Sequence, residues 1–112
     1  MAEPASPSAP PAPIAAFQAL ADVNRLRILD ALREGERCVC ELQEDVGLGQ
    51  SLLSHHLRAL REAGLVIDRR QGRWVHYSLA LDAVEDIEAY LRVLREDAMV
   101  AEPRRGSRCS TV

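Results

Sequence analysis

Two short amphipathic segments separated by glycines constrain the fold of this chain most strongly. In the first, apolar residues recur at the spacing of one helix face from Val39 to Val46, and Gly47-Leu48-Gly49 then interrupts the helix. The second runs from Gln50 to Ala63 with a stripe of leucines and stops at Gly64, a residue typical of helix ends. Two helices joined by a tight turn that contains glycine predict a helix-turn-helix arrangement.

The flanking segments predict three more helices and a β-hairpin. Helical periodicity places these helices at Ile14–Ala21, at Asn24–Arg33 and from Asp82 to about Asp97. Two runs rich in β-branched and aromatic residues are separated by Gln71-Gly72 and predict the strands of the hairpin, Leu65–Arg70 and Arg73–Leu79. The predicted fold is therefore mainly α with a β-hairpin, a winged helix-turn-helix in the order α-α-α-α-β-β-α.

Two apolar faces predict how the outer helices pack. The helix that starts after Asp22, a favourable N-cap, should bury a face formed by Leu26, Ile28, Leu29 and Leu32. On the last helix, an apolar stripe recurs at spacings of three and four residues, formed by Val84, Ile87, Leu91 and Leu94. Such a stripe on a terminal helix predicts the seam of a homodimer, shared with the helix around Ile14–Leu20.

Length and composition bound the organisation of the chain. Its 112 residues, 47% of them hydrophobic, suffice for one compact domain, which we place at residues 14–97. Residues 1–13 are mostly Pro, Ala and Ser and predict a disordered tail, and residues 98–112 predict a flexible C-terminal tail. No apolar run approaches the roughly 20 residues that span a bilayer, and the N-terminus lacks a signal-peptide pattern. We therefore expect a cytoplasmic protein with no membrane partner.

Charge is distributed unevenly along the chain. The net charge of −3 does not favour a polyanionic partner, because DNA affinity depends largely on phosphate contacts. Between Gln50 and Ala80, however, five arginines stand against two acidic residues, whereas the stretch from Leu81 to Asp97 holds six acids and two arginines. We predict that double-stranded DNA contacts the exposed side chains of the basic stretch, with Gln50, Ser51, Ser54, His55 and Arg58 in the major groove and Arg69, Arg70 and Arg73 on the wing.

The cysteines suggest a ligand chemistry. Cys38 and Cys40 are separated by one residue, a poor spacing for a disulfide in a reducing compartment, and the odd third cysteine is Cys109. Thiolates are the donors that soft ions prefer, but two thiols at a helix start are equally compatible with small buried side chains. Residues i and i+2 of a helix point to different sides, so a shared ion requires a non-helical start. We expect ligand binding to unwind or re-aim this first turn.

Four sequence blocks follow one another in the predicted order of the elements. They are Leu20-Ala21-Asp22-x-x-Arg25-Leu26-x-Ile28-Leu29, Cys38-Val39-Cys40-Glu41-Leu42, Ser54-His55-His56-Leu57-x-x-Leu60-x-x-Ala63-Gly64-Leu65-Val66 and Gly72-Arg73-Trp74-Val75-x-Tyr77. Together they closely resemble the ArsR/SmtB family of bacterial metal-responsive repressors, over roughly residues 14–95. The resemblance implies a dimeric winged helix-turn-helix repressor that binds operator DNA.

Within that family, Cys-Val-Cys followed by an acidic residue and leucine is the mark of arsenic and antimony sensors. Cadmium and lead sensors add N-terminal cysteines and zinc sensors commonly carry histidine ligands on the last helix, and this sequence has neither feature. The resemblance therefore implies that Cys38 and Cys40 bind the inducer, As(III) or Sb(III), with no other cofactor required. The usual third cysteine is replaced by Gln43, so a third thiolate would come from Cys109 of the same or the other subunit.

Other functions have less support in the sequence. An enzyme is not expected, because a glycine-rich phosphate loop and paired catalytic carboxylates are absent and a short chain offers little pocket volume. The same fold could instead sense cadmium, lead, zinc, copper or thiol oxidation through Cys38 and Cys40. A protein-interaction module without DNA is disfavoured by the basic stretch. Adjacent helix residues diverge by about 100°, so we expect His56 to pack locally rather than share an ion with His55.

Overall fold

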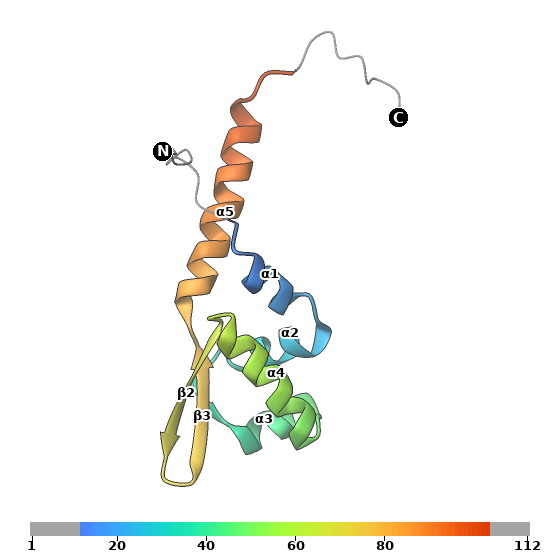
Figure 1. The fold of residues 1–112 in the computed structure, drawn as a ribbon, viewed down its shortest axis with the longest axis vertical. Helices are drawn as coiled ribbons and strands as arrows, with labels where there is room; N and C mark the ends of the chain where they lie inside the picture. The colour runs from blue at the N-terminus through green and yellow to red at the C-terminus, as the bar shows by residue number, and fades with distance from the viewer. Residues whose placement is uncertain (1–11, 104–112) are drawn as a thin grey trace, which may run out of the picture.

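The computed structural model describes residues 12–103, which form five helices and a three-stranded sheet (Figure 1). In chain order the elements are α1 (Ile14–Leu20), α2 (Val23–Ala31), β1 (Arg37–Cys38), α3 (Val39–Val46), α4 (Gln50–Glu62), β2 (Val66–Gln71), β3 (Trp74–Leu79) and α5 (Leu81–Val100). The helix-turn-helix consists of α3 and α4, and β2 and β3 form the wing. The predicted winged helix-turn-helix fold is confirmed, with one strand more than expected.

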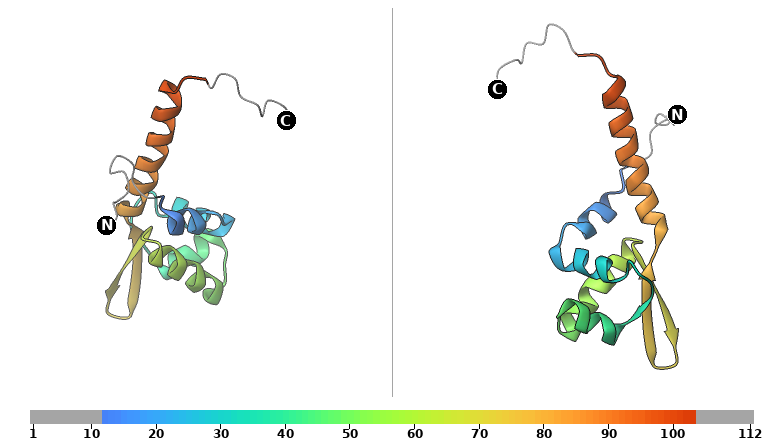
Figure 2. Two further views of the ribbon diagram at one scale, coloured as in Figure 1. Left: turned by 45° about the horizontal axis from the view of Figure 1, so that its top comes forward. Right: turned by 180° about the vertical axis from the view of Figure 1, so that it is seen from behind.

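The elements form a helical body from which two parts project. Helices α1 to α4 pack together, while the wing and α5 extend from this body in opposite directions in all three views (Figures 1 and 2). Among the described residues, no helix combines the length and the apolar character needed to cross a membrane. In these views α5 points away from both the wing and α4.

Helix boundaries follow from local caps. Asp22 is the N-cap of α2, as predicted, and its carboxylate accepts hydrogen bonds from the backbone N–H groups of Asn24 at 2.8 Å and Arg25 at 3.2 Å. Gly47 ends α3 with a φ of 69°, a left-handed conformation that glycine adopts without steric cost. This turn lets α4 begin only three residues later and sets the helix-turn-helix.

A short additional strand extends the wing hairpin into a sheet. The strand order is β1-β3-β2, and both pairings are antiparallel. In register across the sheet, Cys38 lies opposite His76, and His76 lies opposite Arg69. Gly72 begins the two-residue hairpin turn with a φ of 63°. Sequence reasoning missed β1, because a two-residue strand has no periodicity to detect.

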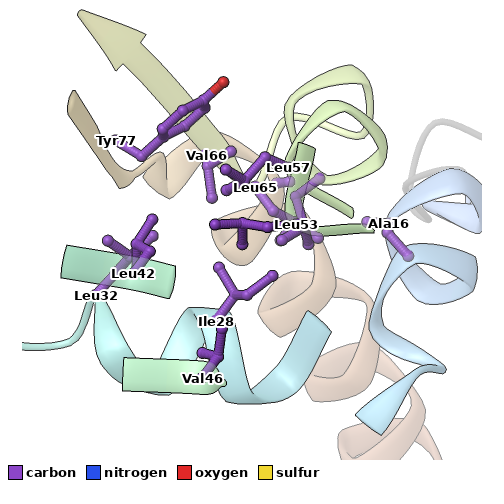
Figure 3. Close-up of a cluster of buried hydrophobic side chains, with 13 residues drawn as sticks. Ala16, Ile28, Leu32, Leu42, Val46, Leu53, Leu57, Leu65, Val66 and Tyr77 are labelled. Carbon is purple, nitrogen blue, oxygen red and sulfur yellow. The ribbon is translucent and has the colours of Figure 1, made fainter. Parts of the chain in front are cut away.

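The hydrophobic core joins the helix-turn-helix to α2 and the sheet (Figure 3). Residues of α2, α3, α4 and β2 meet in it, among them the fully buried Ile28, Leu42, Leu53, Leu57 and Val66. The leucine stripe predicted for α4 faces this core. Burying one such side chain stabilises the fold by about 1.5–3 kcal/mol, so the buried stripe fixes which face of α4 stays exposed.

Two predicted apolar faces are buried only in part. Leu26 is 46% exposed, although we expected it in the core, because α2 turns Ile28 and Leu32 inward and leaves Leu26 at the side. On α1 the buried residues are Ala16 and Ala19, Leu20 packs against the core while only partly buried, and Ile14 is 60% exposed. A periodic pattern identifies a face, but it does not determine which half of that face a neighbour covers.

The chain-end predictions are tested only in part. Helix α5 continues to Val100 and so runs past the predicted domain end at residue 97, because neither glycine nor proline interrupts it before Pro103. Residues 1–11 and 104–112 lie outside the described residues. The disordered and flexible tails therefore stay predictions.

Candidate thiol site and nucleic-acid interface

The cysteine pair lies where β1 passes into α3. Cys38 is the last residue of β1 and the N-cap of α3, with an extended backbone at φ −79° and ψ 164°, and Cys40 follows in the first turn. Cys38 is buried at 9% exposure, whereas Cys40 is exposed. A hydrogen bond with the Cys38 thiol raises the pKa of Cys40, and desolvation raises it further. The two thiols are therefore neighbours, one interior and one at the surface.

The start of α3 meets the condition that a shared ion imposes. Sequence reasoning required a non-helical start and expected binding to create it by unwinding the first turn. In the structure β1 provides that start, because Cys38 is extended rather than helical. Whether binding unwinds or re-aims the first turn of α3 stays a prediction.

Glu41 stabilises the helix start beside the thiols. Its carboxylate accepts a hydrogen bond from the Cys38 backbone N–H at 2.9 Å, and the Cys38 sulfur takes the reciprocal position of a capping box. The bond from Cys38 lowers the pKa of Glu41. At Cys40 a hydrogen bond with the Glu41 backbone lowers the pKa and the negative charge of the Glu41 side chain raises it, and both effects are smaller than those of Cys38 and desolvation. The raised pKa of Cys40 favours its protonated thiol.

The remaining predicted ligand positions differ from the cysteine pair. Gln43 is half-buried one turn after Cys40 and offers an amide instead of a third thiol. Cys109 lies outside the described residues, so its role as third ligand stays a prediction. Within residues 12–103, His, Cys, Asp and Glu side chains do not gather in any group of three or more that could hold a metal ion. Two neighbouring thiols still fit a soft, thiophilic ion, because thiolates are its preferred donors.

A groove of about 460 Å³ lies between the helix-turn-helix and the wing. Its walls include Cys40 and Gln43 from α3 together with five of the predicted DNA contacts, Gln50, Ser54, Arg58, Arg70 and Arg73. A second hollow, of about 480 Å³, lies on the exposed face of α4 and is lined by the five residues predicted for the major groove, Gln50, Ser51, Ser54, His55 and Arg58. The structure thus brings the predicted α4 residues together on one face and places the exposed thiol beside them.

Three arginines line this groove without an acidic partner. In the described part of the chain, the arginines that form salt bridges are Arg33, Arg37, Arg61 and Arg69. Arg58, Arg70 and Arg73 are not among them and have no carboxylate within 4.0 Å. Guanidinium groups match phosphate oxygens with two parallel hydrogen bonds. These three side chains are therefore the cations that the groove offers to an anion.

Arg69, which was predicted to contact DNA from the wing, pairs with a carboxylate in this structure, and its contact with DNA stays a prediction. Its Nη2 and Nε atoms donate to the two carboxylate oxygens of Glu36 at 2.7 and 3.0 Å. This pairing lowers the pKa of Glu36 and raises the pKa of Arg69. Because side chains alternate along a strand and both Asp68 and Arg70 line the groove, Arg69 points to the opposite face of the sheet. Glu36 therefore occupies the donors that we had assigned to DNA.

Two further residues support the interface. Arg61 also lines the groove and pairs with Asp68 of the wing at 3.3 Å. Its place on the polar side of the α4 leucine stripe could have revealed it in the sequence. His56 is 5% exposed, and its Nδ1 accepts a hydrogen bond from Nε of Arg25 at 3.1 Å, so it packs in the interior as expected, but its partner is on another helix and not local. Nothing in the sequence links His56 to Arg25, which lies 31 positions earlier.

Comparisons with known proteins identify the family. A family model described as bacterial regulatory protein, arsR family, matches residues 22–68, from the N-cap of α2 into β2. A probable mercury resistance operon repressor of Streptomyces lividans is 38% identical over 85 residues, which cover 76% of this chain and 68% of that protein. The chain belongs to the ArsR family.

Other ArsR-family relatives are named for arsenic resistance. The arsenic resistance transcriptional regulator ArsR1 of Pseudomonas putida is 47% identical over 77 residues, covering 68% of this chain and 60% of the relative. The arsenical resistance operon repressor of Escherichia coli is 51% identical over 69 residues, covering 61% of this chain and 59% of the relative. The chain thus spans about three fifths of the length of these two proteins. Both relatives are named as regulators of arsenic resistance.

A solved structure supports the same family at the level of the fold. An ArsR family transcriptional regulator superposes on the chain with a TM-score of 0.74 and 26% sequence identity, covering 80% of this chain and 92% of that one. The shared architecture includes most of the described elements and is not limited to the helix-turn-helix.

Proposed function

We propose that this chain is a DNA-binding transcriptional repressor that leaves its operator when trivalent arsenic or antimony binds Cys38 and Cys40. One observation carries the proposal: the exposed thiol of Cys40 lies on the wall of the same groove as Arg58, Arg70 and Arg73. A ligand on the thiols therefore lies beside groups suited to DNA. Relatives named for arsenic resistance support this inducer. The proposal includes a cytoplasmic location, where such a repressor meets its operator.

In this proposal α4 is the recognition helix. Its leucine face is buried, and its opposite face presents amide, hydroxyl, imidazole and guanidinium groups, those of Gln50, Ser51, Ser54, His55 and Arg58. Groups of this kind match the donors and acceptors on base edges in the major groove. Arg70 and Arg73 then contact backbone phosphates, which position the protein without specifying sequence.

A second copy of the chain completes the proposed DNA-binding unit. The apolar stripe of α5 is largely open, with exposures of 42% at Val84, 49% at Leu91 and 51% at Leu94. The rings of Phe17 on α1 and Tyr90 on α5 meet edge-on at 5.9 Å, so the two helices present a joint surface. Open apolar surface on a small domain is typical of an interface, and a twofold dimer places two copies of α4 on one duplex.

The proposed binding chemistry involves no change of oxidation state. Arsenous acid, As(OH)₃, condenses with two thiols: each thiol proton joins one As–OH group and leaves as water, while an S–As bond forms. The product is (RS)₂As–OH with two waters, and arsenic stays trivalent. The raised pKa of Cys40 keeps this thiol in the protonated form that the condensation consumes. The third position on arsenic keeps its hydroxyl, or the thiol of Cys109 condenses there in the same way, with the hydroxyl leaving as a third water.

Release follows from a difference in affinity. A ligand can shift an equilibrium only by as much as it prefers one state over the other. If the metalloid binds the DNA-free protein a hundredfold more tightly than the DNA-bound protein, operator binding weakens by the same factor, about 2.7 kcal/mol. The groove wall shared by Cys40 and the unpaired arginines is where the two states would differ.

Fluorescence anisotropy tests this proposal. Reduced protein is bound to a labelled duplex from the region upstream of its own gene and titrated separately with arsenite, antimonite, mercury(II), cadmium and zinc. We expect release by the two metalloids, and we expect Cys38→Ser and Cys40→Ser to bind DNA normally without release by arsenite. Cys109→Ser is the matched thiol variant, and an unchanged arsenite affinity would show that two thiolates suffice. Tight DNA binding without release by any ion would reject the sensor and keep the repressor.

A second candidate keeps the fold and changes the signal. One relative is named as a probable mercury resistance operon repressor, and two adjacent thiols also suit other soft ions. Release by mercury(II), cadmium, lead or zinc, with none by arsenite, would favour such a sensor. Release by an oxidant that dithiothreitol reverses would favour a thiol switch, although a disulfide between residues this close is strained.

A further inference from the structure

An ion pair connects the wing to the strand that carries Cys38. Glu36 immediately precedes β1, and both of its carboxylate oxygens accept hydrogen bonds from the guanidinium of Arg69 on β2, at 2.7 and 3.0 Å. The strand order β1-β3-β2 places β3 between the two residues. The pair therefore reaches across the full width of the sheet and joins its two edge strands directly.

The strand that this pair anchors is unusually short. β1 consists of Arg37 and Cys38 alone, which lie opposite Tyr77 and His76 of β3, whereas strands usually have about 5–6 residues. Two pairings hold such a strand weakly, so an ion pair at its first end contributes substantially to its attachment. Its other end is Cys38, the N-cap of α3 and a proposed ligand. Glu36 and Cys38 therefore lie only two residues apart along one backbone segment.

We propose that the Glu36–Arg69 pair couples the thiol site to the wing, so that Arg69 is a positioning residue of the release response and not a DNA contact. This inference rests on the proposed function. In the DNA-binding arrangement the pair holds β2, and with it the adjacent Arg70, in a fixed position relative to α3. When the metalloid bridges the two sulfurs, the altered Cys38 backbone displaces Glu36, and Glu36 draws Arg69 and the wing away from the phosphates.

Glu36→Gln is the principal test, because glutamine keeps the size of the side chain and removes its charge. The quantity measured is the ratio of the DNA dissociation constants with and without saturating arsenite. Exposed ion pairs contribute up to about 1 kcal/mol, so we expect this ratio to fall by up to about fivefold. A purely structural role for the pair would change both dissociation constants by the same factor and leave the ratio unaltered.

Matched variants isolate the pair. Asp68→Asn removes the other ion pair of the wing, Arg61–Asp68, which does not involve β1, and should keep the wild-type ratio. The exchange of Glu36→Arg with Arg69→Glu should restore the ratio that Glu36→Gln reduces. Protection of the cysteines by arsenite against a thiol reagent, measured without DNA, should be the same in all these variants, because none of them alters a sulfur ligand.

The outcomes distinguish this inference from the function on which it rests. A wild-type ratio in Glu36→Gln overturns the inference and leaves the proposed function intact. Tighter DNA binding with an unchanged ratio overturns it as well, because it shows that the released Arg69 reaches phosphate. If arsenite does not protect the wild-type thiols, the proposed function fails and the coupling fails with it.

Discussion

Acidification should destabilise this protein through a buried histidine on α4. His56 is 5% exposed, and its Nδ1 accepts a hydrogen bond from Nε of Arg25 at 3.1 Å, so this nitrogen carries no proton in the folded state. Burial lowers the pKa of His56 below the ordinary value of 6.5, the attraction of Asp22 offsets part of this effect, and Arg25 and His55 add to it. Protonation would remove the acceptor and place a second positive charge beside Arg25.

The direction and size of the effect follow from proton linkage. Because the pKa of His56 is lower in the folded state, the unfolded chain binds the proton more readily below pH 6.5. The contribution of neutral His56 is thus fully present above that pH and is lost as the pH falls through it. The slope approaches about 1.4 kcal/mol per pH unit once the unfolded histidine is fully protonated, so up to about 1 kcal/mol should be lost between about pH 6.5 and 5.5.

Urea unfolding at fixed protein concentration, followed by circular dichroism between about pH 5.5 and 8, measures this loss. His56→Asn keeps an acceptor near the position of Nδ1 and does not titrate, so its free energy of unfolding should depend less on pH. His55→Asn is the matched control on the same helix: His55 is exposed and is the smallest of the causes that lower the pKa of His56, so its replacement should change the slope much less than His56→Asn does. The carboxyl groups of Asp22, Glu36 and Glu41 have ordinary pKa values of 3.8 to 4.5, which the fold lowers. Their effect on stability therefore changes with pH only below the range of about pH 5.5 to 8 that is measured. Equal slopes for wild type and His56→Asn would refute the reasoning.

Three further perturbations test the interface, the dimer and the core. Arg70→Ala should weaken DNA binding and lower the slope of log affinity against log salt by about 0.9 for each phosphate that Arg70 neutralises, and an unchanged slope in anisotropy titrations would remove Arg70 from the interface. Leu94→Glu places a charge on the open stripe of α5 and should give a folded monomer by light scattering, whereas a persistent dimer would place the seam elsewhere. Leu53→Ala empties a fully buried position and should cost about 2–5 kcal/mol in urea unfolding, and a cost under about 1 kcal/mol would contradict the packing described for α4.

The sequence predicted the helices well because their boundaries depend on neighbouring residues. Asp22 caps α2 through its own carboxylate, and Gly47 ends α3 through its own backbone conformation. The exposed side of α4 followed from its leucine stripe, since a helix must bury its apolar face. β1 escaped prediction because its two residues form a strand only where β3 offers them partners. The local pattern of residues does not show whether a partner strand is present.

The residue types of the candidate site could be predicted from the sequence. Which of these residues form ion pairs with each other was harder to predict. The thiols and the α4 face were found, because both are carried by short contiguous motifs. Arg69 and Arg70 are adjacent and looked equivalent, but alternation along β2 sends one to each face of the sheet. Glu36 then captures Arg69 from 33 positions away. The extended backbone of Cys38 likewise depends on β3, so the expected need for unwinding could not be tested before the fold was known.

The ion pairs explain how a chain with a net charge of −3 presents cations to a groove. Among residues 12–103, the salt bridges use Arg33, Arg37, Arg61 and Arg69. The two that reach the wing neutralise Asp68 and Glu36, carboxylates that would otherwise repel phosphate close to Arg70. Acidic residues here serve to hold β2 in place, and the positive field at the groove comes from the arginines that they leave unpaired. Removing one of these acids should therefore change where the wing lies as well as how strongly it attracts DNA, so affinity must be measured in both ligand states.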